Sequence, residues 1–261
     1  MNNNTPKLML HSGGSVATLE QVAAQPTPEQ TGKHFPLRHI DLYEEVRTAL
    51  SHSNVEIESE QHALSPDGQR YFGMLQVGGM EYSTEDFRMT IGIRNSHDKR
   101  FGVGVVFGQK VIVCDNLCFT GEAVIGRKHT RYLCRDLKSL VPRCVGMLGT
   151  RYEESVDRTA AYRQKILSED EARSLTVRAA QKGVLPSSKI LKVLEEFESP
   201  TYPEHRGEDD EGSVWTLKNA FTEVQKGRNI FNLPKAQETL LGILDVTAGV
   251  HQKGRFTSVV S

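Results

Sequence analysis

The first clear pattern of apolar and polar positions along the chain is helical. Apolar residues at spacings of three and four share one face of a helix, and they are Leu42, Val46, Ala49 and Leu50. Asp41 is suited to cap the start of this helix, and the polar run 51–54 marks its end. The pattern predicts one amphipathic helix over about 41–50.

From residue 55 the period of the pattern changes to two, which is typical of strands. Segments 55–60 and 71–77 flank the strong turn signal Ser65-Pro66-Asp67-Gly68 and form a hairpin candidate. Three further alternating segments are 87–94, 101–107 and 110–114, with a turn at 95–98 and a tight bend at Gly108-Gln109. Glycines at 92, 102, 104 and 108 indicate bulges or strong curvature. We expect a curved antiparallel β-sheet.

After about residue 130 the pattern is mainly helical. Leucines 133, 137 and 140 keep helical spacing, Pro142 is expected to kink or break the run, and a helix is expected from 145 to 167. Ser168 and Glu171 form a capping box before the next helix. Further helices are expected at 187–198, 213–227 and 234–247. The predicted fold class is therefore α+β, a curved antiparallel β-sheet followed by a mainly helical C-terminal half.

The pattern also suggests how the chain is divided. Residues 1–36 show weak apolar periodicity with Asn-rich, Gly-Gly and Pro-x-Pro stretches, so burial cannot offset the entropy of ordering, and we expect a disordered tail. Residues 37–261 are expected to form a single α+β domain, sheet-rich over 55–125 and helical over 130–250. An acidic exposed loop is expected at about 199–212, and it is densest at 208–211.

Composition narrows the cellular setting. No apolar run reaches the roughly 18–20 residues that span a bilayer, and the first residues lack the basic and apolar regions of a secretory signal. Four cysteines in 261 residues are too few for a disulfide scaffold. We expect a soluble cytoplasmic protein with no membrane partner, in a bacterial cell or in the host cytoplasm if it is phage-encoded.

Charge is segregated along the chain. The formal net charge is -1, yet between Arg88 and Arg151 twelve Lys or Arg stand against four Asp or Glu. Basic side chains that pair with phosphates release condensed counterions, which drives nucleic-acid binding of any sequence. The interleaved aromatic residues are Phe87, Phe101, Phe107, Phe119 and Tyr132. An aromatic ring that faces solvent can stack on a base for about 1–3 kcal/mol; the alternative is core aromatics beside a solvated basic face.

The spacing of the basic residues favours a further interpretation. Arg127, Lys128, Arg131, Arg135 and Lys138 follow i, i+4, i+8 spacing and would form one basic stripe if this stretch is helical. A sheet backed by such a helix is a plausible groove for single-stranded DNA. The candidate nucleic-acid-binding residues are Arg94, Lys99, Arg100, Lys110, Arg127, Lys128, Arg131 and Arg135. We expect a non-enzymatic protein with no cofactor and no metal, and with a homo-oligomer as a possible assembly.

Two other chemistries have weaker support. Cys114 and Cys118 are one close pair without the second pair of a structural zinc site, and His129 is the candidate extra ligand. A hydrolase would require His97, Asp98 and Cys114 to converge in a pocket. No glycine-rich phosphate loop is present, which disfavours nucleotide hydrolysis.

Two short motifs carry a family resemblance. One is Asn95-Ser96-His97-Asp98 with the following strand into Cys114-Asp115-Asn116, and the other is the run 215–223, which contains Asn219-Ala220-Phe221-Thr222-Glu223. From about Asp41 to Val246 the chain resembles a phage- and plasmid-borne family, the "phage/plasmid-like proteins", a domain of unknown function. The resemblance implies mobile-element biology without an agreed reaction. Lys99-Arg100 stand where small residues usually follow the turn in that family.

The expected architecture is also similar to the core of single-strand-annealing recombinases, which form rings and hold single-stranded DNA in a basic groove. This similarity implies annealing or recombination of DNA by an oligomer. The alternative is a protein-interaction module that inhibits or modulates a host defence protein through its basic face.

Overall fold

The computed structural model describes residues 14–79, 82–84, 87–111, 117–206, 212–226 and 233–250, with the backbone alone at 110–111, 117–124 and 233–234. The strands are β1 (Ser15–Ala17), β2 (Ile57–Leu64), β3 (Arg70–Val77), β4 (Phe87–Ser96), β5 (Val103–Val111) and β6 (Leu117–Arg127). The α-helices are α1 (Leu19–Ala23), α2 (His39–His52), α3 (Leu133–Gly146), α4 (Leu148–Gln164), α5 (Glu169–Gln181), α6 (Ile190–Glu198), α7 (Val214–Gln225) and α8 (Leu233–Ala248). The predicted fold class, α+β with an antiparallel sheet before a helical half, is confirmed.

The sheet is a meander in which each strand pairs antiparallel with the next, in the order β1-β2-β3-β4-β5-β6. In a meander, alternate connections lie at the same end of the sheet. The β2–β3 turn, the β4–β5 turn and the exit from β6 therefore share one end, which we call the hairpin end. The end of β3, the start of β4, the end of β5 and the start of β6 lie at the other end.

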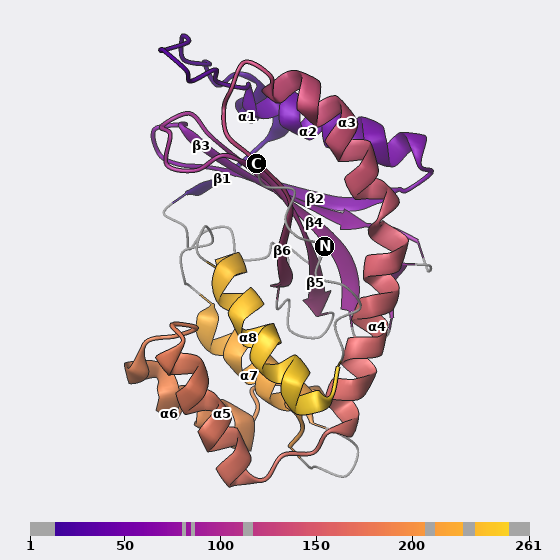
Figure 1. The fold of residues 1–261 in the computed structure, drawn as a ribbon, viewed down its shortest axis with the longest axis vertical. Coiled ribbons are helices and arrows are strands. Elements are labelled where there is room, and N and C mark those ends of the chain that lie inside the picture. Colours follow the sequence, from indigo (N-terminus) through magenta and orange to yellow (C-terminus); the bar gives the residue numbers. More distant parts are fainter. Residues whose placement is uncertain are drawn as a thin grey trace.

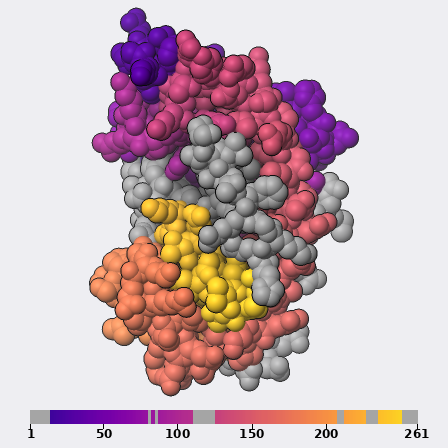
Figure 2. Space-filling model, viewed as in Figure 1, coloured from indigo at the N-terminus to yellow at the C-terminus, as the bar shows by residue number. Residues whose placement is uncertain are grey.

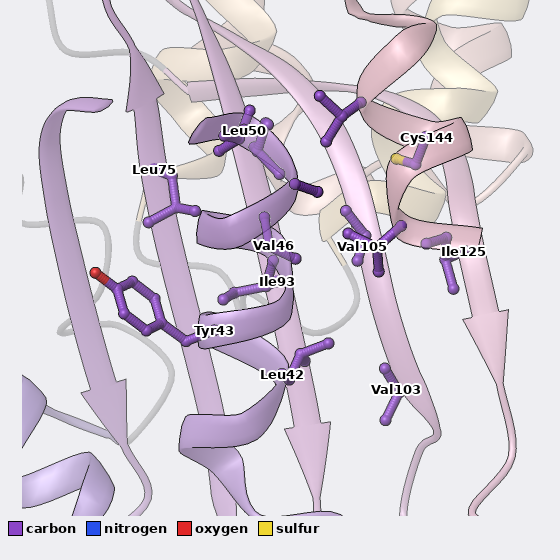
Figure 3. Packing of buried hydrophobic residues seen from close by; sticks show 14 of the residues in the cluster. Leu42, Tyr43, Val46, Leu50, Leu75, Ile93, Val103, Val105, Ile125 and Cys144 are labelled. Carbon is purple, nitrogen blue, oxygen red and sulfur yellow. The ribbon is translucent and has the colours of Figure 1, made fainter. Parts of the chain in front are cut away.

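The first hydrophobic core lies between the sheet and the pair α2 and α3, which cross one face of it (Figure 1). Leu42, Val46 and Leu50 of α2 point toward Ile93 and Val105 of the sheet (Figure 3). These side chains are all nearly inaccessible to solvent. Full burial of each aliphatic side chain contributes about 1.5–3 kcal/mol. The helical spacing near residue 42 therefore stabilises the fold by placing these side chains on the buried face of α2.

A second core lies in the helical half. Helix α4 leads from α3 to helices α5–α8, which form the orange-to-yellow part of the molecule (Figures 1 and 2). Trp215, Leu217 and Phe221 of α7 pack with Leu240 and Leu244 of α8. Helix α8 also packs along β6. The run from Trp215 therefore forms a helix whose apolar residues belong to the second core.

The predicted helix starts are partly confirmed. Asp41 does not cap α2, because the helix begins at His39 and Asp41 lies in its first turn. Ser168 caps α5, because its hydroxyl accepts from the backbone N–H of Glu171 while the Glu171 carboxylate accepts from the backbone N–H of Ser168. Ser213 and Thr216 make an equivalent box at α7. The polar run at 51–54 does end α2, whose last residue is His52.

Two local predictions are wrong. The tight bend at Gly108-Gln109 does not exist, because β5 continues through both residues and Gly108 pairs with both Thr90 and Phe119, although the pairing with β6 is irregular between Val106 and Gly108. The break expected at Pro142 is also wrong, because Pro142 lies inside α3 and the break before α4 falls at Met147 instead; the kink expected there as the alternative stays a prediction. In both places a residue that weakens local structure is retained because neighbouring elements hold the backbone.

The N-terminal residues also differ from the expected tail. Residues 15–17 form β1 and extend the sheet by pairing with Ala63 and its neighbours in β2. Thr18 caps α1, and Val22 is buried against the first core. Residues 1–13 lie outside the described part, so the tail prediction is wrong for about 15–36 and stays a prediction before that.

The structure describes the acidic loop predicted at about 199–212 only in part. The acidic stretch begins with a short 3-10 turn, Pro203–His205, in which His205 is buried, while 207–211 lie outside the described residues. Among the helices that the structure describes, none has the length and apolar character to cross a membrane.

Candidate nucleic-acid interface at the hairpin end

Six of the eight candidate residues lie at the hairpin end. They come from the β4–β5 turn, from the end of β6 and its exit, and from the start of α3. We call this set the basic end: Lys99, Arg100, Arg127, Lys128, Arg131 and Arg135. The turn and the β6 exit touch directly, because a Cβ added at Gly102 would lie 2.2 Å from the carbonyl oxygen of Arg127.

Tyr132 is an exposed aromatic ring within the basic end. Its side chain keeps 43% of its accessible surface. The guanidinium carbons of Arg131 and Arg135 lie 4.6 and 4.7 Å from the ring centroid, and Arg131 donates a hydrogen bond to the Tyr132 hydroxyl. Cation–π contacts at exposed sites contribute about 0.5–1 kcal/mol each, enough to orient the ring without burying it.

The other cations of the basic end are mostly exposed. Arg100 is 69% exposed and pairs with Asp98 at 3.4 Å, and the same carboxylate meets Arg70 at 3.4 Å. Lys128 is exposed. Lys99, whose φ of 64° lies in the left-handed region, donates from Nζ to the Thr31 hydroxyl at 3.1 Å. Two acidic residues lie beside these cations: Asp98 pairs with Arg100, and Asp136 pairs with Arg135 at 3.1 Å.

Arg94 and Lys110 do not join the basic end. Arg94 is half-buried on β4 with its guanidinium 5.2 Å from the Phe101 ring centroid, and burial lowers the pKa of this guanidinium. Lys110 lies toward the opposite end of β5. Lys110 is seven positions along the strand from Val103, about 23 Å at the usual rise. Its side chain lies outside the described residues.

The predicted helical stripe is wrong, although its residues do come together. Arg127 ends β6, residues 128–132 form an irregular connection, and Arg135 and Lys138 alone lie on α3. The meander and the close approach at Gly102 bring the cations together from three segments. Spacing along one helix therefore grouped residues that mostly do lie near one another, but the helix is not what brings them together.

The aromatic residues interleaved with the cations differ in their exposure to solvent. Phe87 and Phe107 belong to the first core, and Phe101 lies beneath Arg94. The side chain of Phe119 lies outside the described residues. Tyr132 is thus the exposed ring among the four whose side chains are described.

The turn motif at 95–98 organises a buried polar cluster next to the basic end. The amide of Asn95 donates to the Leu37 carbonyl oxygen at 2.7 Å and to Nδ1 of His39 at 3.0 Å. Its oxygen accepts from Nε2 of His129 at 2.7 Å and from the backbone N–H of Ser96 at 2.9 Å. All four hydrogen-bonding positions of this side chain are therefore used.

Histidines surround Asn95. His97 donates from Nε2 to the Leu37 carbonyl oxygen at 2.8 Å and stacks on His39 with ring centroids 3.9 Å apart. The rings of His34 and His129 lie 5.0 Å apart. We call His34, His39, His97 and His129 the histidine cluster. Sequence reasoning considered His97 and His129 singly and missed the cluster, because its members come from distant segments.

Burial sets the protonation of this cluster. Burial lowers the pKa of His39 to about 4, and the positive charge that His97 could carry is the next cause. Burial also lowers the pKa of His129 to about 4, with His34 as the next cause. The pKa of His97 and that of His34 are also lowered, first by burial. Near pH 7 these rings are therefore neutral.

The alternative chemistries find no support in the described geometry. The Asp98 carboxylate contacts Ser96, Arg70 and Arg100, while the ring of His97 is bound to the Leu37 carbonyl oxygen. Cys114 lies outside the described residues, so convergence of the three hydrolase candidates stays untested.

The alternative of a zinc site also finds no support among the described residues. Cys134 is exposed and Cys144 is buried in the first core, where burial raises the pKa of its thiol to about 12. His129 is engaged by Asn95. Among the described residues, no group of three or more His, Cys, Asp or Glu is placed to hold a metal ion. Cys114 and the side chain of Cys118 lie outside them.

Comparisons with protein-family models, with curated proteins and with solved structures give no match for this chain.

Proposed function

We propose that this chain binds single-stranded nucleic acid, single-stranded DNA in the first place, at the basic end, and that it carries out no reaction on it. The observation that carries the proposal is the gathering of six Lys or Arg at the hairpin end, together with the exposed ring of Tyr132, which Arg131 and Arg135 contact. Cations attract the phosphate backbone and the ring offers a stacking surface, the two elements of sequence-tolerant single-strand binding.

The composition of this site favours single strands over duplex. A base must be unstacked before it can lie on an aromatic side chain, and single strands present such bases without the energetic cost of opening a helix. Annealing or recombination by an oligomer of a phage or plasmid protein is the finer form of this proposal, and it rests on the resemblance described above.

Charge reversal tests the proposal. We expect Lys128→Glu with Arg131→Glu to weaken binding of fluorescein-labelled oligo(dT), measured by anisotropy at several salt concentrations. Removal of two phosphate contacts should lower the slope of log K against log salt by about 1.4. The matched control is Lys192→Glu with Lys235→Glu, which changes the same charge at exposed positions near the starts of α6 and α8, where a helix tolerates Glu.

The control should bind like the parent protein, and thermal unfolding should show that both variants fold. Absence of oligo(dT) binding by the parent protein at low salt would rule out the proposal. If a nuclease-resistant, stoichiometric host protein were then recovered instead, the interaction-module alternative would replace it.

A further inference from the structure

Residues 31–38, which we call the latch segment, are held on the hairpin end by three other parts of the chain. Lys99 of the β4–β5 turn donates to Thr31. The backbone N–H of Phe35 donates to the carbonyl oxygen of His129 at 2.9 Å. The Leu37 carbonyl oxygen accepts from both Asn95 and His97. The latch segment thus occupies Lys99 and is tied to the 128–132 connection at His129, between the exposed Lys128 and Arg131.

The bonds that hold the latch segment require neutral histidines. Nε2 of His39 donates to the Gly68 carbonyl oxygen at 3.0 Å, and its Nδ1 accepts from Asn95. A proton on Nδ1 would therefore place two donors 3.0 Å apart. Nδ1 of His97 is buried without a partner in the part of the chain that the structure describes, so a proton there would add an unsatisfied donor.

Protonation would also create repulsion between close rings. The stacked pair His39 and His97 would bring two positive charges within about 4 Å in a buried place, and the partly exposed His34 would bring a second charge to 5.0 Å from the buried His129. The low pKa values of His39 and His129, about 4, agree with this geometry.

Other charged and titratable groups face the cluster. Asp98 favours protonation of His97, whereas Lys99 opposes protonation of His34. Tyr71 of β3 lies against His39, with ring centroids 5.5 Å apart, and also meets His62. The remaining neighbours along the adjoining segments are Arg38, Asp41, Tyr43, Glu60, Lys128 and Arg131.

We propose that the histidine cluster is an acid-sensitive latch, whose protonation releases residues 31–38 from the hairpin end and makes the basic end more available to a polyanion. Release frees Lys99 from Thr31, detaches the 128–132 connection from Phe35 so that Lys128 and Arg131 can adjust to a ligand, and adds positive charge from the histidines. These three effects all favour phosphate binding. By linkage, a bound polyanion in turn favours protonation of the cluster.

The release itself is tested without nucleic acid, by hydrogen exchange of peptides covering 27–38 at pH 7.5 and 5.0, corrected for intrinsic exchange. We expect these peptides to lose protection at pH 5.0 while peptides from α5 keep theirs. The double variant His39→Gln with His129→Gln should stay protected, because Gln can donate and accept without titrating. His52→Gln, at the exposed end of α2, is the matched control and should behave like the parent protein.

If the double variant fails to fold, NMR titration of the histidines in the parent protein tests the latch instead. A cooperative change of several histidine signals between pH 6.5 and 4, together with new mobility of 31–38, supports the latch. Independent titration of each ring near its ordinary pKa, or unchanged protection of 27–38 at pH 5.0, overturns it.

The link to binding rests on the proposed function, and the outcomes separate the two. For the parent protein, oligo(dT) affinity should rise by about tenfold more than for His39→Gln with His129→Gln between pH 7.5 and 5.0, the effect of one pKa unit on one histidine. If 27–38 is released but oligo(dT) never binds, the proposed function fails and the latch stands. If oligo(dT) binds at pH 7.5 but 27–38 stays protected at pH 5.0, the latch fails and the proposed function stands.

Discussion

At the scale of single residues, Asn95 and Tyr132 show two opposite uses of polarity. Asn95 is fully buried, and three of its four hydrogen bonds join β4 to Leu37, His39 and His129, while the fourth is to the adjacent Ser96. Tyr132 is exposed, and its contacts with Arg131 and Arg135 leave part of the ring open to solvent. The first is suited to fix a structure, and the second to receive a ligand.

Truncation of Tyr132 gives a prediction at this scale. We expect Tyr132→Ala to lose about 1–3 kcal/mol of oligo(dT) binding, which is roughly 5- to 150-fold in affinity, because a stacking surface is removed. Tyr132→Phe should retain most of the affinity. The Tyr132 side chain makes no capping bond to α3, so thermal unfolding of both variants should match that of the parent protein. Equal affinity of Tyr132→Ala and the parent would exclude stacking on this ring.

At the scale of elements, the hairpin end depends on how closely the β4–β5 turn approaches β6. Gly102 makes that approach possible, because any Cβ there would meet the Arg127 carbonyl oxygen. Gly126, one residue before Arg127, has open space on its Cβ side. The two glycines lie at the same end of the sheet but have different reasons to be there.

These glycines form a matched pair for experiment. We expect Gly102→Ala to lower the free energy of unfolding by about 1–3 kcal/mol, because the backbone of β6 must shift to make room. It should also weaken oligo(dT) binding by moving Arg127 and Lys128. Gly126→Ala should change stability by no more than about 0.5 kcal/mol. Urea denaturation followed by circular dichroism gives both values, and equal effects of the two substitutions would contradict the close packing at Gly102.

At the scale of the whole molecule, two hydrophobic cores share one chain. The first holds α2 and α3 on the sheet, and the second lies within the helical half. They are joined by α4 and by a buried hydrogen bond, in which Nζ of Lys218 donates to Oε1 of Gln109 at 2.9 Å. Buried histidines occur near both cores, since His205 is nearly inaccessible and burial lowers its pKa to about 4.

The stability of the molecule should therefore fall in acid. The unfolded chain takes up protons on these histidines near pH 6.5, whereas the folded chain holds His39, His129 and His205 neutral until about pH 4. Stability is thus present above pH 6.5 and is lost as pH falls toward 4, by about 3 kcal/mol at most for each histidine. Urea denaturation at pH 7.5, 6.5, 5.5 and 4.5 measures this loss, which His205→Gln should reduce and His52→Gln should not. A flat profile across that range would refute neutral burial of the histidines.

Much of the fold follows from local sequence signals. The spacing around Leu42, the alternation in the strands and the capping box at Ser168 each depend on residues within a turn or two of one another. These signals placed α2, most strands, α5 and α7 close to their observed positions. They failed at Gly108 and Pro142, where a local preference is outweighed by pairing or packing with residues far away.

The candidate site, too, follows partly from the sequence and partly only from the tertiary structure. Sequence alone determined that cations are concentrated between 88 and 151, and that the turn at 95–98 is distinctive. Only the tertiary structure decided which of these residues meet, because the meander brings alternate connections to one end and leaves Lys110 toward the other. It also decided that His34, His39, His97 and His129 gather around Asn95. Contacts between residues 34–39, 95–97 and 129 depend on strand register and chain path, which no local pattern encodes.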